Sequence, residues 1–389
     1  AKAYYLFTFL AALGIGTHTT IYVLFLQKLG LNMSDVLLIN AGFVSSMVIL
    51  ELPTGMLADG KSRLWSIRAG IFTQTLMLTA YAFCTGFWSA LLVEIGLGVG
   101  DSFMSGARQA WITDALARRN QENDLDRVFG TAAIFNSTGF CGGGVIGAAL
   151  GLIDFKLSWF AGSILAGASF LVSLYCMNSH GEPLKRISEI AALKQSLQKF
   201  KASPALIWAV ICTILVMSFS RPMFYFWQPF FGPRSGQFGL AFVWIAITCS
   251  IAIGNYVIRN IGVPKNKEVI RISSSILIMG FGIAIIGHWP DLLTPLAIIC
   301  IYNFGHGMFR PQIDVFEQRR VRSEYRATYG SLSSFLQGLG NALILFIFGF
   351  LLLDYKWQES VIVTVWTMCG ALLTIYGIAC HLLRKKIQD

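Results

Sequence analysis

The chain has 389 residues, of which 55% are hydrophobic and only 13% are charged, and its mean hydropathy is +0.63. Soluble proteins carry roughly 25% charged residues. The composition therefore excludes a soluble globular protein and predicts a polytopic membrane protein. Apolar stretches of about twenty residues predict helical spans, because the strands of membrane β-barrels are only roughly ten residues long.

Twelve membrane helices are predicted in chain order, at 4–26, 34–57, 64–84, 88–113, 127–151, 155–178, 204–230, 237–258, 268–287, 291–317, 326–353 and 358–383. One long polar connection lies at the centre of this series and divides it into two halves. We therefore expect an all-α membrane protein with an N-terminal six-helix bundle over 1–178 and a C-terminal six-helix bundle over 204–389. The linker between them, 179–203, has the spacing of an amphipathic surface helix.

The distribution of Lys and Arg predicts the orientation of these helices. If the N-terminus lies in the cytoplasm, most of the 30 basic residues lie on the cytoplasmic side. The basic residues on the outer side are then Lys28, Lys156, Arg234 and Lys356, and those within spans are Arg108, Arg221 and Arg310. We expect a multi-pass protein of the cell membrane, such as a bacterial inner membrane, with both termini cytoplasmic. The net charge of +10 is then a topology signal and requires no nucleic-acid partner.

The two halves of the chain also resemble each other. "RVFGTAAIF" (127–135) aligns with "ATYGSLSSF" (327–335), and "HTTIYVLFLQ" (18–27) aligns with "RPMFYFWQPF" (221–230). Each half has an even number of predicted helices, so both halves have the same orientation. This predicts a parallel repeat with a central cavity between the halves. The internal repeat makes a monomer sufficient for function.

The first cytoplasmic loop and its flanks read "ELPTGMLADGKSR" (51–63). The positive-inside rule alone would explain its basic residues. The segment is also similar to the G-x-L-A-D-R-x-G-R signature of the major facilitator superfamily. The matching residues are Gly55, Leu57, Ala58, Asp59 and Arg63, whereas Gly60 and Ser62 depart from the signature. The resemblance implies a twelve-helix transporter in which Asp59 forms a charge relay with the cytoplasmic end of the fourth helix.

The candidate cytoplasmic gate follows from this resemblance and from the repeat. Arg108 and Asp114 are available to Asp59 in the first half, and Gly55 permits close helix packing. In the second half, Arg310 and Asp314 are four residues apart and can pair directly. The expected gate residues are Gly55, Asp59, Arg63, Asp114, Arg310, Asp314 and Glu317, the last of which is the repeat counterpart of Asp114.

The predicted fifth helix is rich in glycine. Proton antiporters of the superfamily carry G-x8-G-x3-G-P-x2-G-G in this helix, and the matching residues here are Gly130, Gly139, Gly143 and Gly147. Gly144 and Ala148 replace the Pro and the last Gly of that pattern. The resemblance implies an antiporter, and therefore export. The alternative is ordinary close packing of small residues, which membrane helices use generally.

The predicted fourth helix carries three charges, in "VEIGLGVGDSFMSGARQAW" (93–111). Glu94, Asp101 and Arg108 recur at a spacing of seven, so on one continuous helix they share a face. Charged groups at this depth must face protein or water. We expect Asp101, near the middle of the helix, to be the main proton-coupling residue and Glu94 the second. The superfamily's helix-four pattern has Arg where this chain has Glu94, so the role of that Arg does not carry over.

The remaining polar and aromatic residues of the spans suggest a solute site. Arg221 precedes Pro222 and has no acid in its own helix, which suits contact with an anion. His18 and His306 are either hydrogen-bonded packing residues or participants in proton transfer. The candidate substrate-binding residues are Arg221, Arg108, Tyr22, Tyr225, Trp227, His18 and His306.

These observations predict a proton-coupled secondary transporter that exports an amphipathic small organic molecule with an anionic or zwitterionic part by alternating access. One alternative is a proton symporter that imports an anionic metabolite. An alternative from another class is a non-transporting receptor or scaffold on the same fold. No nucleophile–base pair, CxxC pair or metal-ligand cluster is present, so we expect no enzymatic activity, no metal and no cofactor besides the proton gradient. The expected partners are a small-molecule substrate and the lipid bilayer.

Overall fold

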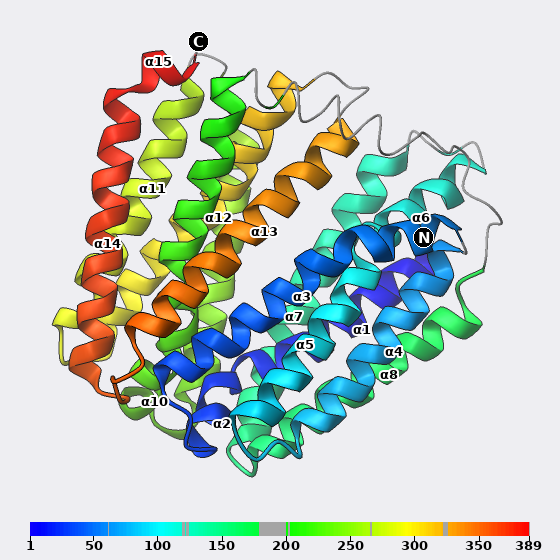
Figure 1. Cartoon of the computed structure of the whole chain (residues 1–389), viewed down its shortest axis with the longest axis horizontal. Coiled ribbons are helices and arrows are strands. Elements are labelled where there is room, and N and C mark those ends of the chain that lie inside the picture. Colours follow the sequence, from blue (N-terminus) through cyan, green and yellow to red (C-terminus); the bar gives the residue numbers. More distant parts are fainter. Residues whose placement is uncertain are drawn as a thin grey trace. The chain divides into compact units, whose positions relative to one another are not determined.

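The computed structural model describes residues 1–60, 62–118, 121, 124–178, 200, 203–264, 267–321 and 326–388. Within these ranges every regular element is a helix, and no strand is present (Figure 1). The predicted all-α membrane fold is therefore confirmed. The amphipathic helix predicted in the linker falls on residues that are almost all outside the described ranges.

The helices follow one another along the chain, and the connections between them are short except for the one at the centre, 176–203. They are α1 (Lys2–Thr19), α2 (Tyr22–Lys28), α3 (Met33–Gly60), α4 (Arg63–Tyr81), α5 (Phe87–Met104), α6 (Ala107–Ala117), α7 (Leu125–Gly151), α8 (Phe155–Tyr175), α10 (Pro204–Ile261), α11 (Glu268–Ile285), the 3-10 helix η3 (Ile286–His288), α12 (Leu293–Arg320), α13 (Arg326–Leu351), α14 (Glu359–Leu382) and α15 (Arg384–Gln388).

Within the described ranges, nine helical segments are long and apolar enough to cross a membrane, or ten if the bent pair α1 and α2 forms one span. The two segments of α10, Pro204–Gly236 and Gly239–Ile261, count separately because Gly236 has φ 66° and interrupts the helix. Helices α4 and α12 are not among the nine, since polar side chains such as Gln74 and Asn303 dilute their apolar character. Twelve spans therefore remain a prediction.

The predicted fourth span is not one continuous helix. Ser105 is extended, with ψ 128°, and Gly106 has φ 68°, so α5 ends at Met104 and α6 begins at Ala107. Positive φ is readily adopted by glycine and rarely by other residues. Arg108 lies beyond this break, so the spacing of seven no longer places it on one continuous helix face with Glu94 and Asp101.

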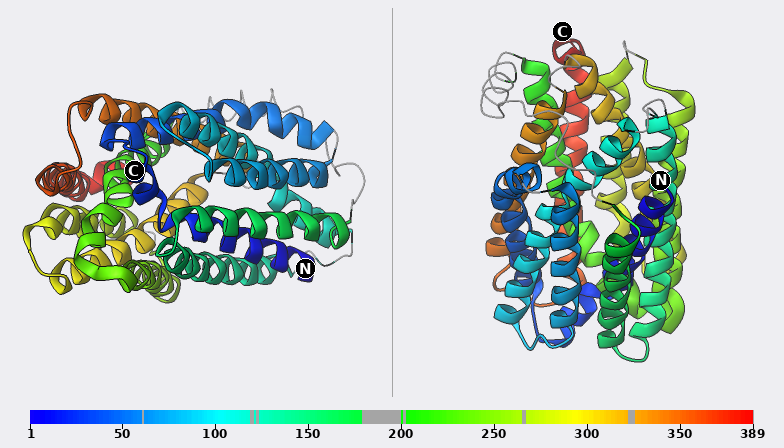
Figure 2. Two further views of the ribbon diagram at one scale, coloured as in Figure 1. Left: turned by 90° about the horizontal axis from the view of Figure 1, so that it is seen from below. Right: turned by 90° about the vertical axis from the view of Figure 1, so that its right-hand side faces the viewer.

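The chain divides into two compact units. Unit 1 comprises Ala1–Arg186, Leu240–Trp244 and Phe346–Leu353, and unit 2 comprises Ile187–Gly239, Ile245–Leu345 and Asp354–Asp389. In unit 1, α1 packs along α7 and α8, α5 packs along α3 and α4, and α4 also packs along α8 (Figure 2). In unit 2, α11 packs along α12 and α14.

Glycines bring α1 and α7 into close contact within unit 1. A Cβ atom at Gly139, Gly143 or Gly147 would overlap with a backbone carbonyl of α1, at Phe9, Leu13 and Thr17 respectively. A Cβ atom at Gly130 would meet no atom within 4 Å. The predicted packing role of the glycines in this helix therefore does not extend to Gly130.

Candidate functional site

Glu94 is buried in unit 1, where two tyrosines hold its carboxyl group. The residue lies on α5 and is only 5% exposed. The hydroxyl of Tyr81 on α4 donates to Glu94 Oε1 at 3.2 Å, and the Tyr22 hydroxyl also bonds to this carboxyl group. Asn40 Nδ2 on α3 donates in turn to the Tyr22 hydroxyl at 2.8 Å. Side chains from three other helices thus gather around one acid.

An aromatic stack surrounds this acid. Tyr81 lies flat against Trp159, with ring centroids 3.9 Å apart, and His18 stacks on Trp159 at 4.9 Å. His18 Nδ1 is also 3.2 Å from the carbonyl oxygen of Gly14, within hydrogen-bonding distance. This geometry favours the packing alternative for His18. Tyr22, at 8% exposed, is likewise part of the buried core.

Asp101 lies two helical turns further along α5. Gln74 Nε2 on α4 donates a hydrogen bond to Asp101 Oδ1. The positive charge of Arg108 acts electrostatically on Asp101, despite the break between α5 and α6, and also on Tyr4. None of the ion pairs found among the described residues includes Glu94. The two acids of α5 therefore have different surroundings, since only Asp101 has both a neighbouring cation and an amide donor.

An ion pair joins the beginning of α4 to the end of α6. Arg63 Nη1 is 2.5 Å from Asp114 Oδ2, and the same nitrogen donates to the Ala110 carbonyl oxygen at 2.9 Å. Both belong to the predicted cytoplasmic gate. The side chain of Asp59 lies outside the described part of the structure. A Cβ atom at Gly55 would meet no described atom within 4 Å, so the close packing expected there is not found.

A series of side-chain hydrogen bonds and one ion pair connects α12 to α13 in unit 2. Arg310 Nε is 3.2 Å from Asp314 Oδ1, and Arg310 Nη1 donates to Gln337 Oε1 at 3.2 Å. Gln337 Nε2 donates to Ser333 Oγ at 2.8 Å, and Ser333 Oγ donates to Glu317 Oε1 at 3.3 Å. The structure thus brings the predicted residues Arg310, Asp314 and Glu317 into one network.

The candidate solute-binding residues of unit 2 divide into two groups. Arg221 on α10 acts electrostatically on His306 and Tyr302 of α12, and Arg310 also acts on His306. Tyr225 and Trp227 are 4% and 3% exposed, so both are packed inside the protein. Of this set, Arg221 and His306 lie near the charged network, whereas Tyr225 and Trp227 offer little surface to a solute.

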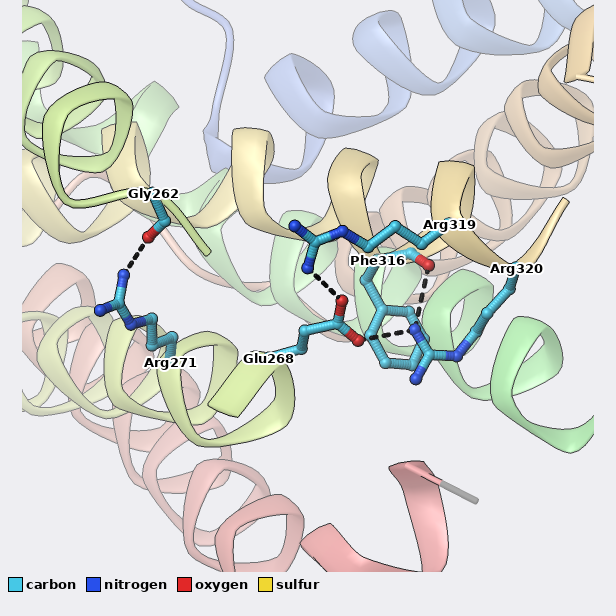
Figure 3. Close-up of polar contacts among 6 residues, drawn as sticks. All are labelled: Gly262, Glu268, Arg271, Phe316, Arg319 and Arg320. Atoms are coloured by element: carbon cyan, nitrogen blue, oxygen red, sulfur yellow. Dashed lines mark hydrogen bonds and ion pairs between the residues drawn. The ribbon is translucent and has the colours of Figure 1, made fainter. Parts of the chain in front are cut away.

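A further ion-pair site, which sequence analysis missed, joins the beginning of α11 to the end of α12 (Figure 3). Glu268 is 2% exposed; its two carboxylate oxygens lie 2.6 Å from Arg319 Nη1 and 2.7 Å from Arg320 Nη1. The Arg320 guanidinium also covers the Phe316 ring at 3.6 Å and donates to the Phe316 carbonyl oxygen. The signal in the sequence is one acid at a helix start opposite two consecutive arginines at a helix end.

Sequence analysis also missed several hydrogen-bond partners of the charged residues, because these partners are neutral. Gln74, Asn40, Tyr81 and Gln337 all bond to a charged residue of a network or to one of its ligands. An amide inside an apolar run is the signal that could have found three of them, because a buried amide needs a hydrogen-bond partner. Among the described residues, no group of three or more His, Cys, Asp or Glu could hold a metal ion.

Apolar helices long enough to cross a membrane, with hydrogen-bonded acids between them, are the construction of a multi-pass membrane protein. The model of the Major Facilitator Superfamily matches residues 4–345, nearly the whole chain. The chain belongs to the major facilitator superfamily, and it is a membrane transporter of that type.

Individual relatives are distant. A stretch of 125 residues is 25% identical to an uncharacterized MFS-type transporter, MJ1560, of Methanocaldococcus jannaschii, and it covers only 32% of either chain. The nucleoside transporter NupG has a TM-score of 0.78 at 16% identity over 98% of both chains. A POT family transporter in complex with 5-aminolevulinic acid has a TM-score of 0.77 at 11% identity, over 100% of this chain and 96% of the other. At such identities the solved structures establish the fold alone.

Proposed function

We propose that the chain is a proton-coupled secondary transporter that exports a small amphipathic organic solute with an anionic or zwitterionic group. The observation that carries the coupling is Glu94, a 5%-exposed carboxyl group bonded by tyrosine hydroxyls and included in no ion pair of the described residues. An isolated ionised carboxylate is costly in an apolar interior, whereas a proton neutralises it in place. Tyrosine hydroxyls can accept as well as donate, so they suit both protonation states.

We propose Asp101 as the second proton-coupling candidate, although its position near the middle of the predicted helix makes it the first candidate from the sequence. Gln74 and Arg108 both stabilise the ionised form of Asp101, because one donates a hydrogen bond and the other supplies positive charge. Asp101 therefore suits a permanent countercharge. Glu94 suits a group that binds and releases a proton in each cycle.

The solute class rests on the charges of unit 2. Arg221, His306 and Arg310 gather basic groups around one stretch of α12, and Asp314 adds an acid beside them. The fold neighbours are described as transporters of nucleosides and peptides, and one is in complex with 5-aminolevulinic acid. Small polar organic solutes of this kind agree with such a site. Export rests on the antiporter spacing of glycines in α7.

The test uses the purified protein in liposomes that enclose a pH-sensitive dye, with radiolabelled dipeptides, nucleosides and 5-aminolevulinic acid as trial solutes. As a solute flows inward, an antiporter moves protons outward and the lumen becomes alkaline. A symporter makes the lumen acidic, which would favour the import alternative. The sign does not depend on the orientation of the protein in the liposome. Solute movement without a pH change would contradict proton coupling, and a receptor or scaffold would move no solute.

The Glu94→Gln variant tests whether Glu94 is the residue that couples proton movement to solute movement. We expect it to lose proton movement and solute accumulation but to keep the exchange of internal for external solute, since exchange needs no net proton transfer. Asp101→Asn is the matched comparison, which keeps the shape of its side chain. If Glu94→Gln transports protons at the wild-type rate, Glu94 is not the coupling group.

Membrane placement completes the proposal. We propose a monomer in the cell membrane with both termini in the cytoplasm, on the distribution of Lys and Arg.

A further inference from the structure

A charged pair on α12 keeps an open surface. The Arg310 and Asp314 side chains, 3.2 Å apart, are 47% and 41% exposed. The helix ends at Arg320, so Arg310 lies about three turns inside it. Charged side chains within a span are costly in lipid, so they face water or a polar partner. An exposed ion pair contributes little to stability, and its two members can exchange partners readily.

The guanidinium group of Arg310 is held from a second helix. Its Nη1 donates to Gln337 of α13, and Gln337 is bonded to Ser333, which is bonded to Glu317. The three supporting side chains are 8%, 3% and 9% exposed, so they are fixed by the packing around them. Arginine offers five N–H donors. In the described part of the chain its Nη2 donates to no acceptor, which leaves donors for a ligand.

Charge is ordered along this face of α12. His306, Arg310 and Asp314 follow one another at intervals of four residues and therefore share a face. The charge of Arg221 acts on His306 at the first end of the series, so that end is positive. Asp314 makes the other end negative. The arrangement is dipolar, with about one helical turn between its two signs.

We propose that Arg310 and Asp314 recognise the charges of the solute, and that the solute is a zwitterion whose carboxylate binds Arg310 and whose ammonium group binds Asp314. This inference rests on the proposed function and names its solute class. A zwitterion supplies a partner to both residues when it replaces the ion pair. A solute with a single charge leaves one residue of the pair without a partner, which opposes binding. The network through Gln337 keeps the guanidinium group in position.

The experiment measures the affinity of the full chain in lipid nanodiscs by calorimetry, with three probes of similar size. Alanyl-alanine is the zwitterion, N-acetyl-alanyl-alanine carries only the negative charge, and alanyl-alanine amide carries only the positive charge. We expect the zwitterion to bind about tenfold or more tightly than either analogue. In Arg310→Gln, we expect alanyl-alanine to bind no more tightly than the amide. In Asp314→Asn, we expect it to bind no more tightly than the acetylated dipeptide. Glu359→Gln, at a separate and partly exposed ion pair, keeps the wild-type order.

A double variant separates recognition from folding. Arg310→Asp with Asp314→Arg keeps an ion pair but reverses its polarity beside Arg221 and His306. We expect it to unfold at the wild-type temperature and to lose the preference for the zwitterion. Wild-type affinity in this variant would contradict the assignment of the carboxylate to Arg310. The site is overturned if both single variants keep the wild-type preference, or if the wild-type protein binds none of the probes.

The outcomes also distinguish this site from the proposed function. A solute that drives proton movement equally in the wild type and in both single variants removes the site and leaves the function standing. Binding of alanyl-alanine that depends on Arg310 and Asp314, without any proton movement, supports the site and removes proton coupling.

Discussion

The ion pair between α4 and α6 in unit 1 and the ion-pair site between α11 and α12 in unit 2 have opposite polarity. In unit 1, a base stands at the first residue of α4 and its acid partner, Asp114, in the last turn of α6. In unit 2, an acid, Glu268, stands at the first residue of α11 and its basic partners at the end of α12. A helix has a positive N-terminus and a negative C-terminus. The helix dipoles therefore oppose the pair in unit 1 and stabilise the pair in unit 2.

The difference indicates which contact can open. Glu268 is 2% exposed and holds two arginines, whereas Arg63 and Asp114 are 21% and 16% exposed. Breaking the unit 2 site would leave the buried carboxylate of Glu268 without a cationic partner, which is costly. We therefore expect the unit 1 pair, which contains Arg63 of the superfamily signature, to open more readily than the site in unit 2.

The largest expected effect follows from removing the acid in unit 2. Glu268→Gln removes the buried acid that pairs with Arg319 and Arg320, which are themselves 35% and 20% exposed, and we expect the free energy of unfolding to fall by about 1.5–3 kcal/mol. Thermal unfolding of the purified protein measures this change. Arg63→Gln is the comparison in unit 1, where we expect a smaller loss. Equal losses at the two sites would remove the distinction between a persistent and a labile pair.

A reversal of polarity in unit 1 gives a smaller effect of the opposite sign. Arg63→Asp with Asp114→Arg places each charge where the helix dipole favours it, and we expect a gain of about 0.3–1 kcal/mol at each helix end. If the pair opens during transport, turnover should slow as stability rises. Thermal unfolding and the rate of solute exchange measure the two changes. A double variant no more stable than the single variant Asp114→Arg would show that the dipoles do not set the difference.

The smallest effect is expected at one further ion pair in each unit. These two pairs have the same polarity relative to the helix dipoles. Lys28 pairs with Asp154, and Arg234 pairs with Glu359, so in both units an acid lies at the start of a helix. Lys28 is 63% exposed, and we expect Lys28→Gln to change the free energy of unfolding by about 0–1 kcal/mol. A loss as large as that of Glu268→Gln would mean that exposure does not determine the strength of these pairs.

Sequence reasoning reached the fold class and the family, because both depend on features within single segments. The apolar runs predict spans, and the loop around Asp59 and the glycines of α7 carry the superfamily resemblance. The pairing of Arg310 with Asp314 was visible from their separation of four residues, and the structure contains that ion pair. These inferences share one property, which is that the residues involved are close in sequence.

The partners of the buried acids were beyond sequence reasoning because they lie on other helices. Gln74 is 27 residues from Asp101, and Asn40 is 18 residues from Tyr22. The break at Gly106 was also missed, since a Ser-Gly pair is compatible with a continuous membrane helix. Tertiary packing determines such contacts and helix interruptions, and the periodicity of the sequence does not reveal them.

The interruption at Ser105 and Gly106 allows the two helices of the predicted fourth span to move separately. The segment before the joint carries Glu94, and the segment after it carries Asp114. Backbone hydrogen bonds continue within each segment, but at the joint itself Ala107 N–H turns back to the Ser105 carbonyl oxygen. A rotation at glycine meets little steric resistance. The two segments can therefore change direction relative to each other at Gly106, and we expect Arg63 to separate from Asp114 without displacing Glu94 from its tyrosine partner.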